Sequence, residues 1–378
     1  MRGSEGILAY NPPQLIAATL NRVGTGAPPV RISDPLPAGM LSNYNPATVS
    51  LKSRDRDQNS ATVYQWNTAM QFLLPWDSTF ELAYVGNQSR NLLAIYSANQ
   101  VPFGKDGSVA ANRPFPEWQQ IGHAVTQAQS SYNALQVKFE KRMSRGFYAL
   151  TSYTFASALD EYGAWGASSD VQIGDNFRLE RGPQAQVSRQ RLTYSQVWRL
   201  PFGRGRALAG DMPALAEAIF GGWQISGIAT MRSGLPVNVT LASSGVDPRT
   251  GLNYTFLNRN GGALRPNRVG EPNTSSDARA DRFHYLDAAA YQVQPVNTPG
   301  NAARNSAWGP GFFTTDLSFV KRFDIDEQKG IDFRLEMFNA FNRTNYNNPS
   351  GSFGSSGFGI ISDAYDPRIM QAAVRFFF

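Results

Sequence analysis

Residues 62–85 read TVYQWNTAMQFLLPWDSTFELAYV, in which two alternating segments flank a short Pro-Trp-Asp sequence. Alternate positions of the first segment are mostly large and apolar: Tyr64, Trp66, Thr68, Met70, Phe72 and Leu74. The intervening positions are mostly small or polar: Gln65, Asn67, Ala69, Gln71 and Leu73. Successive side chains of a β-strand point to opposite faces of the sheet. The stretch therefore predicts two antiparallel strands with one apolar face, joined by a tight turn.

The same period of two recurs in segments of strand length along the rest of the chain. Besides 64–74 and 80–85, these segments are 135–142, 147–155, 192–200, 223–231, 317–323, 331–337 and 370–378. The pattern predicts nine strands and an all-β, antiparallel architecture. A short helix is expected over residues 213–220, because Pro213 lies near its start and Gly221 and Gly222 follow its end.

The connections between the expected strands alternate in length. Short turns fall at 74–78, 143–146 and 324–330, and a turn of intermediate length at 201–221. The long connections, rich in Gly, Pro, Asn and Ser, are 87–130, 158–188, 234–311 and 342–367. Such long connections are uncommon in compact soluble domains, whereas outer-membrane barrels have short turns on one side and long loops on the other. A soluble antiparallel sandwich or propeller also alternates, and it remains the competing interpretation.

Aromatic residues cluster near both ends of the expected strands. Those beside the short turns are Trp76, Phe147, Phe202, Trp223, Phe323 and Phe378. Those near the long loops are Tyr64, Trp66, Tyr153 and Phe155. Two aromatic belts at the two membrane–water interfaces produce this distribution, although aromatic residues also favour strands in general.

Composition and motifs argue against an enzyme. The 378 residues include no Cys and two His, which removes thiolate nucleophiles, disulfides and thiolate metal sites. The net charge of +6 is mild, and we expect no nucleic-acid partner. Asp55, Asp57 and Asn59 imitate the start of a calcium loop, but Ser60 replaces the required Gly and Trp66 replaces the bidentate Glu. We therefore expect no catalytic residue, no metal site and no cofactor.

Seven stretches, taken in order, resemble the C-terminal part of the barrel of TonB-dependent outer-membrane receptors. The resemblance is to the Oar-like kind, whose full-length members usually begin with a carboxypeptidase-regulatory-like domain. The stretches are TVYQWNTAMQFLLPWDSTFELAYVGNQSRNLL (62–93), YNALQVKFEKRMSRGFYALTSYTFASALD (132–160), RLPFGRGR (199–206), FGGWQISGIATMRSGLPVNVT (220–240), GNAARNSAWGPGFFTTDLSFVKRF (300–323), IDFRLEMFNAFNRTNYNNP (331–349) and DPRIMQAAVRFFF (366–378).

The resemblance implies an antiparallel transmembrane β-barrel fragment of about nine strands, with long extracellular loops and short periplasmic turns. Residues 62–378 would form this barrel portion, and residues 1–61 would be the remnant of an extracellular loop. The signal peptide, TonB box and plug domain of the family find no match here, and we expect them upstream. Because the family's barrel has about 22 strands, we expect these nine to form an open curved sheet or a forced narrow barrel, with 64–74 at the free edge or paired to the last strand.

The resemblance also implies a function and partners. We expect a receptor in the cell outer membrane, with a periplasmic C-terminus, that imports an iron chelate, an oligosaccharide or a peptide. Its partners would be outer-membrane lipid, the TonB energy-coupling complex and the barrel-assembly machinery. That machinery would read the alternating C-terminal residues Val374, Phe376 and Phe378. An adhesion or structural β-protein, membrane-bound or secreted, is the alternative.

Candidate contacts for the solute are aromatic and charged residues on the long loops. They are Tyr162, Trp165, Tyr254, Arg259 and Trp308. The competing interpretation is that loop aromatics pack the loops together, and the sequence does not name a solute.

Overall fold

The computed structural model describes residues 51–105, 109–162, 171–174, 176–203, 205–241, 244–247, 250–251, 253–255, 264–274, 277–295, 297–324 and 329–378. The long strands are β2 (Thr62–Leu74), β3 (Ser78–Ser97), β4 (Ile121–Ser144), β5 (Phe147–Asp160), β7 (Gln190–Arg199), β8 (Trp223–Arg232), β16 (Phe312–Asp324), β17 (Gly330–Phe338) and β19 (Ile369–Phe377). The short strands are β1 (Leu51–Arg54), β6 (Gly182–Pro183), β9 (Pro236–Val237), β10 (Thr240–Leu241), β11 (Ser244–Val246), β12 (Asn253–Thr255), β13 (Asn267–Arg268), β14 (Tyr291–Gln292), β15 (Ala307–Trp308) and β18 (Ser352–Phe353). The helices are α1 (Val109–Asn112) and α2 (Ala214–Phe220), with 3₁₀ turns at Phe177–Glu180 and Ala288–Ala290.

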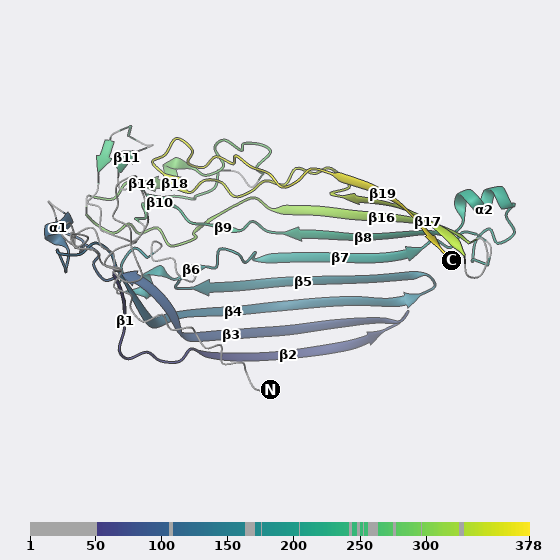
Figure 1. Ribbon diagram of the computed structural model, residues 1–378, viewed down its shortest axis with the longest axis horizontal. Helices are drawn as coiled ribbons and strands as arrows, with labels where there is room; N and C mark the ends of the chain where they lie inside the picture. Colours follow the sequence, from purple (N-terminus) through teal and green to yellow (C-terminus); the bar gives the residue numbers. More distant parts are fainter. Residues whose placement is uncertain are drawn as a thin grey trace, which may run out of the picture.

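The nine long strands lie side by side in one antiparallel sheet, in the order β19-β17-β16-β8-β7-β5-β4-β3-β2 (Figure 1). These are the nine strands that the alternation predicts. Within the described residues β2 pairs only with β3, and β19 only with β17. The sheet is therefore open, with β2 at one edge. This is the open curved sheet, one of the two forms that the sequence predicts.

The short turns lie at one end of the sheet and the long connections at the other (Figure 1). The C-terminus lies at the short-turn end. The expected helix is also present as α2, in the connection between β7 and β8. Among the described residues, no helix is long and apolar enough to cross a membrane. The alternation of connection lengths therefore corresponds to two distinct ends of the molecule.

Strand register places all the apolar faces on the same side of the sheet. One row of directly paired residues crosses seven strands as Met70, Leu82, Val137, Tyr153, Leu192, Met231 and Phe313. The neighbouring row, on the other side, is polar throughout: Gln71, Glu81, Lys138, Ser152, Thr193, Thr230 and Thr314. We call these two sides the apolar face and the polar face. A slip of one residue would exchange them, so the register is strongly specified.

The apolar face is exposed and does not form a core. Met70, for example, is 63% exposed, and Phe72, Phe333, Val374 and Phe376 are also exposed. A soluble sandwich would bury these side chains against a second sheet. The other sheets in the described residues have only two short strands each. The sandwich interpretation is therefore wrong for this chain.

One expected loop boundary is wrong, and a short strand forms within another expected loop. The connection predicted over 87–130 is in large part strand, because β3 continues to Ser97 and β4 begins at Ile121. At 20 and 24 residues, these strands exceed the roughly 9–11 residues that cross a membrane. Residues 51–54, expected in a loop, form β1 and pair in parallel with β4. The β3–β4 hairpin therefore projects well beyond the rest of the sheet at the long-connection end.

The buried core lies in the long connections. One cluster joins the β8–β16 connection to the β17–β19 connection through residues such as Val239, Tyr291 and Phe353. A second cluster packs Val171 and Phe177, between β5 and β7, against the extended parts of β3 and β4. We call this packed assembly of the long connections the loop platform.

A buried ion pair ties two connections of the loop platform together. The Arg265 guanidinium lies 2.5 Å from the Glu180 carboxylate, and both side chains are almost fully buried. Glu180 also accepts the Gln172 backbone N–H at 2.8 Å, and Arg265 Nε donates to the Ala302 carbonyl at 2.9 Å. Buried charges are tolerated where pairing and hydrogen bonds replace water, as they do here.

A second pair fixes the loop platform to the sheet. Arg304 contacts the Asp160 carboxylate at the end of β5, and its Nε donates to the Glu180 carbonyl at 2.9 Å. Burial lowers the pKa of the Arg304 guanidinium to about 10, which leaves it charged at neutral pH. The two arginines thus hold the β5–β7 and β8–β16 connections in a fixed relation.

The register makes a prediction about the apolar face. Phe333→Arg places a charge on that face beside Lys321, its neighbour in the register. If this face contacts hydrocarbon, the substitution lowers the unfolding free energy, by less than the roughly 2–4 kcal/mol of a midplane position because Phe333 lies toward the short-turn end. Arg334→Phe, on the polar face, removes an exposed ion pair with Glu336 and costs about 0–1 kcal/mol. Urea unfolding in phospholipid vesicles measures both, and the reverse order contradicts the register.

The buried pair makes a second prediction. Glu180→Ala leaves Arg265 buried without its carboxylate and costs about 3–5 kcal/mol locally. We expect faster proteinase K cleavage in the loop platform and an intact sheet. Glu271→Ala is the matched control, because its pair with Arg268 is exposed, with the Glu271 side chain 91% accessible. Equal cleavage rates for the two variants would show that the buried pair does not hold the platform.

Candidate functional site

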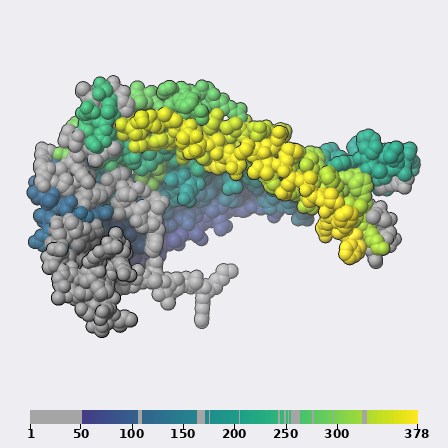
Figure 2. Space-filling view, turned by 45° about the horizontal axis from the view of Figure 1, so that its top comes forward, coloured from purple at the N-terminus to yellow at the C-terminus, as the bar shows by residue number. Residues whose placement is uncertain are grey.

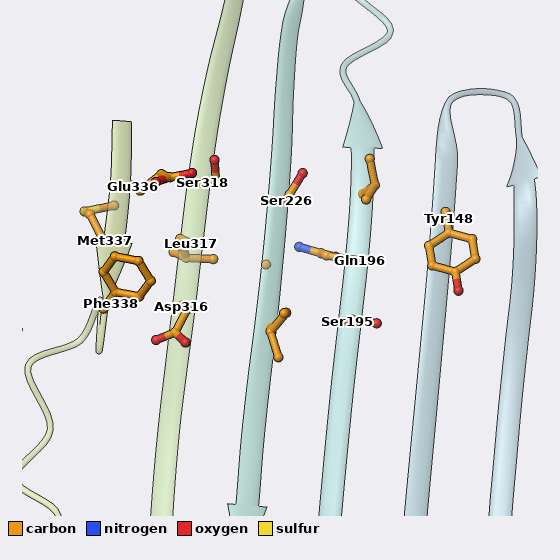
Figure 3. Close-up of a pocket in the computed structure, with 13 residues that line it drawn as sticks. Tyr148, Ser195, Gln196, Ser226, Asp316, Leu317, Ser318, Glu336, Met337 and Phe338 are labelled. Atoms are coloured by element: carbon orange, nitrogen blue, oxygen red, sulfur yellow. The ribbon is translucent and has the colours of Figure 1, made fainter. Parts of the chain in front are cut away.

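The polar face of the sheet carries a hollow of about 280 Å³ over β5, β7, β8, β16 and β17 (Figure 3). Its lining comes from residues 148, 195–197, 226–228, 316–318 and 336–338. Figure 2 shows the molecule from another side, with the C-terminal segment lying along the long axis. The hollow belongs to the wall that a closed barrel would turn toward its interior.

Small residues at one level of the sheet create the hollow. A single row of paired residues runs Tyr148, Val197, Ser226, Ser318, Glu336 and Gln371 from β5 to β19. Ser226 and Ser318 lie between the larger Tyr148 and Glu336 (Figure 3). Serine side chains leave space where neighbouring rows have longer ones, so the polar face is recessed there.

Two carboxylates give the hollow its chemistry. Asp316 accepts the Asn339 backbone N–H at 2.9 Å, which orients one of its oxygens. Glu336 accepts from the Gln371 amide and lies 3.5 Å from the Arg334 guanidinium. With the hydroxyls of Tyr148 and the serines, these groups make a wall that can donate and accept hydrogen bonds. The rest of the lining includes the apolar residues Val197, Ile228, Leu317, Met337 and Phe338, so the hollow combines a few polar groups with an apolar floor.

Three of the five proposed solute contacts, Tyr162, Tyr254 and Trp308, belong to the described residues, and each lies in a different part of the loop platform. The Tyr162 hydroxyl donates to the Ile95 carbonyl at 3.1 Å, and its ring lies 6.3 Å from the Phe177 ring. The Trp308 carbonyl accepts from the Asn273 amide at 2.7 Å, and the Arg189 guanidinium lies 6.0 Å from its ring. Both aromatics therefore help to pack the platform.

Tyr254 occupies a slot beside two glycines. A Cβ on Gly354 would lie 2.3 Å from the Tyr254 hydroxyl, and one on Gly245 would lie 2.7 Å away. Burial, followed by the charge of Asp247, raises the pKa of Tyr254. Trp165 and Arg259, the other two proposed contacts, lie outside the described residues. Solute binding by these five residues stays a prediction.

The expected assembly signal lies on the edge strand. Val374 pairs with Phe333 and Phe376 pairs with Ile331, so both continue the apolar face. Phe378, the last residue, is almost fully exposed beyond the end of β19. All three side chains are exposed. Their recognition by the barrel-assembly machinery stays a prediction.

The residues of the hollow did not stand out in the sequence. The alternation alone places Asp316, Ser318, Ser226 and Glu336 each on the polar side of its own strand. Only the register between strands shows that Ser226, Ser318 and Glu336 share one level and that Asp316 lies in the next row of the same face. In the described residues no group of three or more His, Asp or Glu side chains is placed to hold a metal ion.

Comparison with known proteins identifies the family. The model of the outer membrane beta barrel domain matches residues 1–371. No curated protein matches the chain. Among solved structures, the outer membrane transporter YddB from Escherichia coli is 9% identical, with a TM-score of 0.46, and the match covers 88% of this chain and 34% of that one.

Two further solved structures are similar at the same level. The siderophore receptor PirA from Acinetobacter baumannii is 10% identical, with a TM-score of 0.42, and the match covers 87% of this chain and 34% of that one. The FrpB iron transporter from Neisseria meningitidis (F3-3 variant) is 10% identical, with a TM-score of 0.41 and coverage of 86% and 32%. The chain thus spans about a third of the length of these proteins. Because the family model matches nearly the whole chain, this protein belongs to the outer membrane beta barrel domain family, and its antiparallel sheet is an outer-membrane sheet.

Proposed function

We propose that the chain forms the C-terminal part of the barrel of a TonB-dependent receptor that imports a scarce polar solute. The observation that supports this most directly is the polar face, which carries a continuous row of polar residues across seven strands and the hollow lined in part by Asp316 and Glu336. A polar interior is common to outer-membrane barrels. The hollow with its two carboxylates therefore favours a solute path more than the polar face alone does.

In this proposal the loop platform receives the solute outside the cell. Its buried ion pairs preorganise the connections, so that less conformational entropy is lost when a solute binds. Movement of an upstream plug, driven by the TonB complex, then opens a route along the polar face. Iron chelates, oligosaccharides and peptides all fit the hydrogen-bonding character of the wall. The mechanism is binding followed by gated passage and includes no catalytic step.

Import is tested by uptake in cells that lack the gene, compared with cells that carry it. The probes are ⁵⁵Fe-loaded siderophores, fluorescent oligosaccharides and labelled peptides, each with and without a protonophore. We expect one probe class to depend on both the gene and the proton gradient. If no probe depends on the gene and the deletion instead impairs adherence to surfaces, the adhesion alternative replaces the proposal.

The wall itself is tested by replacing its carboxylates. Asp316→Asn with Glu336→Gln keeps the shapes but removes two charged acceptors, and hydrogen bonds to charged groups contribute about 1.5–3 kcal/mol each. We expect uptake of the dependent probe to fall roughly tenfold or more, with unchanged binding at the cell surface. Glu140→Gln, on the same face but outside the hollow, is the control. Equal uptake by the double variant and the control contradicts a role for the hollow.

A further inference from the structure

The β7–β8 connection carries the helix α2 with an exposed apolar side. Leu215 is 76% exposed and Ile219 is 53% exposed, and Phe220 beside them is also exposed. Residues four apart lie on the same side of a helix, so Leu215 and Ile219 form one apolar stripe. The acidic side chain of this helix points elsewhere, since a Cβ on Gly221 would lie 2.1 Å from Glu217 Oε1. A helix this short and apolar needs a surface to cover it.

A lysine docks α2 onto the apolar face of the sheet. Lys321 belongs to the apolar face of β16, where it pairs with Trp223 and Phe333, yet it is only 4% exposed. Its ammonium group donates to the Glu217 carbonyl at 3.2 Å and to the Gly221 carbonyl. The last carbonyls of a helix lack intrahelical partners and attract cations. The helix end thus satisfies a charge that the apolar face would otherwise expose.

A tryptophan completes the docking. The Trp223 indole N–H donates to the Ile219 carbonyl at 2.8 Å, and the Lys321 ammonium lies 5.9 Å from the Trp223 ring. On the strand side, the Leu200 N–H donates to the Trp223 carbonyl at 2.9 Å. The C-terminal end of α2 is therefore held on the same side of the sheet as the apolar face, at the short-turn end (Figure 1).

The apolar stripe of α2 continues the membrane-facing surface. Exposed apolar residues run from the strand ends into this connection: Trp198, Phe323, Phe202, Leu208 and Phe220. Arg206 is also exposed in this connection and suits anionic headgroups. Trp residues favour the membrane–water interface, and Trp198 and Trp223 both lie at this end of the sheet. The exposed apolar surface of this connection is continuous with the apolar face of the sheet, which contacts lipid. Lipid is therefore expected to cover this surface as well.

We infer that α2 lies in the headgroup region of the periplasmic leaflet, with Leu215, Ile219 and Phe220 inserted among phospholipid chains. Lys321 is the positioning residue that holds the helix against the barrel wall. This inference uses the outer-membrane location of the sheet and is independent of whether the protein imports a solute. It makes the β7–β8 connection a lateral anchor at the membrane surface, whereas the other described turns at this end are tight.

Spin labelling tests the location, because the chain contains no native Cys. Leu215→Cys and Ile219→Cys are labelled in protein purified from outer membranes and reconstituted in phosphatidylethanolamine–phosphatidylglycerol vesicles. Asp211→Cys, exposed in the same connection, is the matched control. We expect the ratio of oxygen to nickel-chelate accessibility at 215 and 219 to exceed that at 211 several-fold. A ratio equal to that at 211 places the helix in water. Protection from both probes shows a protein cover. Either result overturns the inference.

A second measurement tests the role of Lys321 separately. In the Lys321→Leu background we expect the nitroxide at position 219 to gain mobility, because two contacts with the helix carbonyls are lost. Phe319→Leu, on the same face of β16, is the control and should leave the mobility unchanged. Unchanged mobility in both backgrounds means that Lys321 does not position the helix. Heat-modifiable migration on gels confirms that each variant is folded.

Discussion

Hydrogen bonding of the backbone inside a membrane is the constraint from which the rest of this structure follows. Hydrocarbon offers no partner to an N–H or C=O group, so a spanning strand must pair with its neighbours, as the seven strands between β19 and β2 do on both sides. Continuous pairing fixes the register across the sheet. The register then turns every second side chain toward lipid and the others toward the interior. The separation into an apolar and a polar face is a consequence of this pairing.

The same constraint explains where the molecule keeps its core. The apolar face has lipid as its solvent, so its large side chains need no protein to cover them. The long connections lie in water and must bury their own apolar residues, as they do around Tyr291 and Phe353. Their buried arginines add hydrogen bonds between separate connections. The molecule therefore joins a sheet whose apolar side is solvated by lipid to a platform stabilised like a small soluble domain.

Lys321 shows how an exception to the pattern is accommodated. A lysine on the apolar face conflicts with the register, and strand periodicity alone offers no partner for it. The partner is the helix that the β7–β8 connection contributes, whose terminal carbonyls receive the ammonium group. A charge that would oppose membrane insertion thereby becomes a docking contact. The interaction links a strand position to a turn far from it in sequence.

The nine strands were predictable because alternation is a local property of each segment. The hollow was not, because Ser226, Ser318 and Glu336 come to one level only through pairing between strands. The extension of β3 past Asn87 was missed because its polar residues, read in sequence, resemble a loop. The apolar residues beyond them, such as Ala94, are covered by the loop platform, a contact that the sequence does not show. The ion pair of Arg265 with Glu180 joins residues far apart in sequence and left no local signal.

The most direct test of this account is the environment of four successive residues in β5. Cysteines at Thr151, Ser152, Tyr153 and Thr154 are labelled one at a time with bimane in vesicles containing brominated phospholipid. Thr151 and Tyr153 lie on the apolar face, and Ser152 and Thr154 on the polar face. The account predicts strong quenching at 151 and 153 and weak quenching at 152 and 154. Quenching of all four alike, or in the opposite phase, contradicts it.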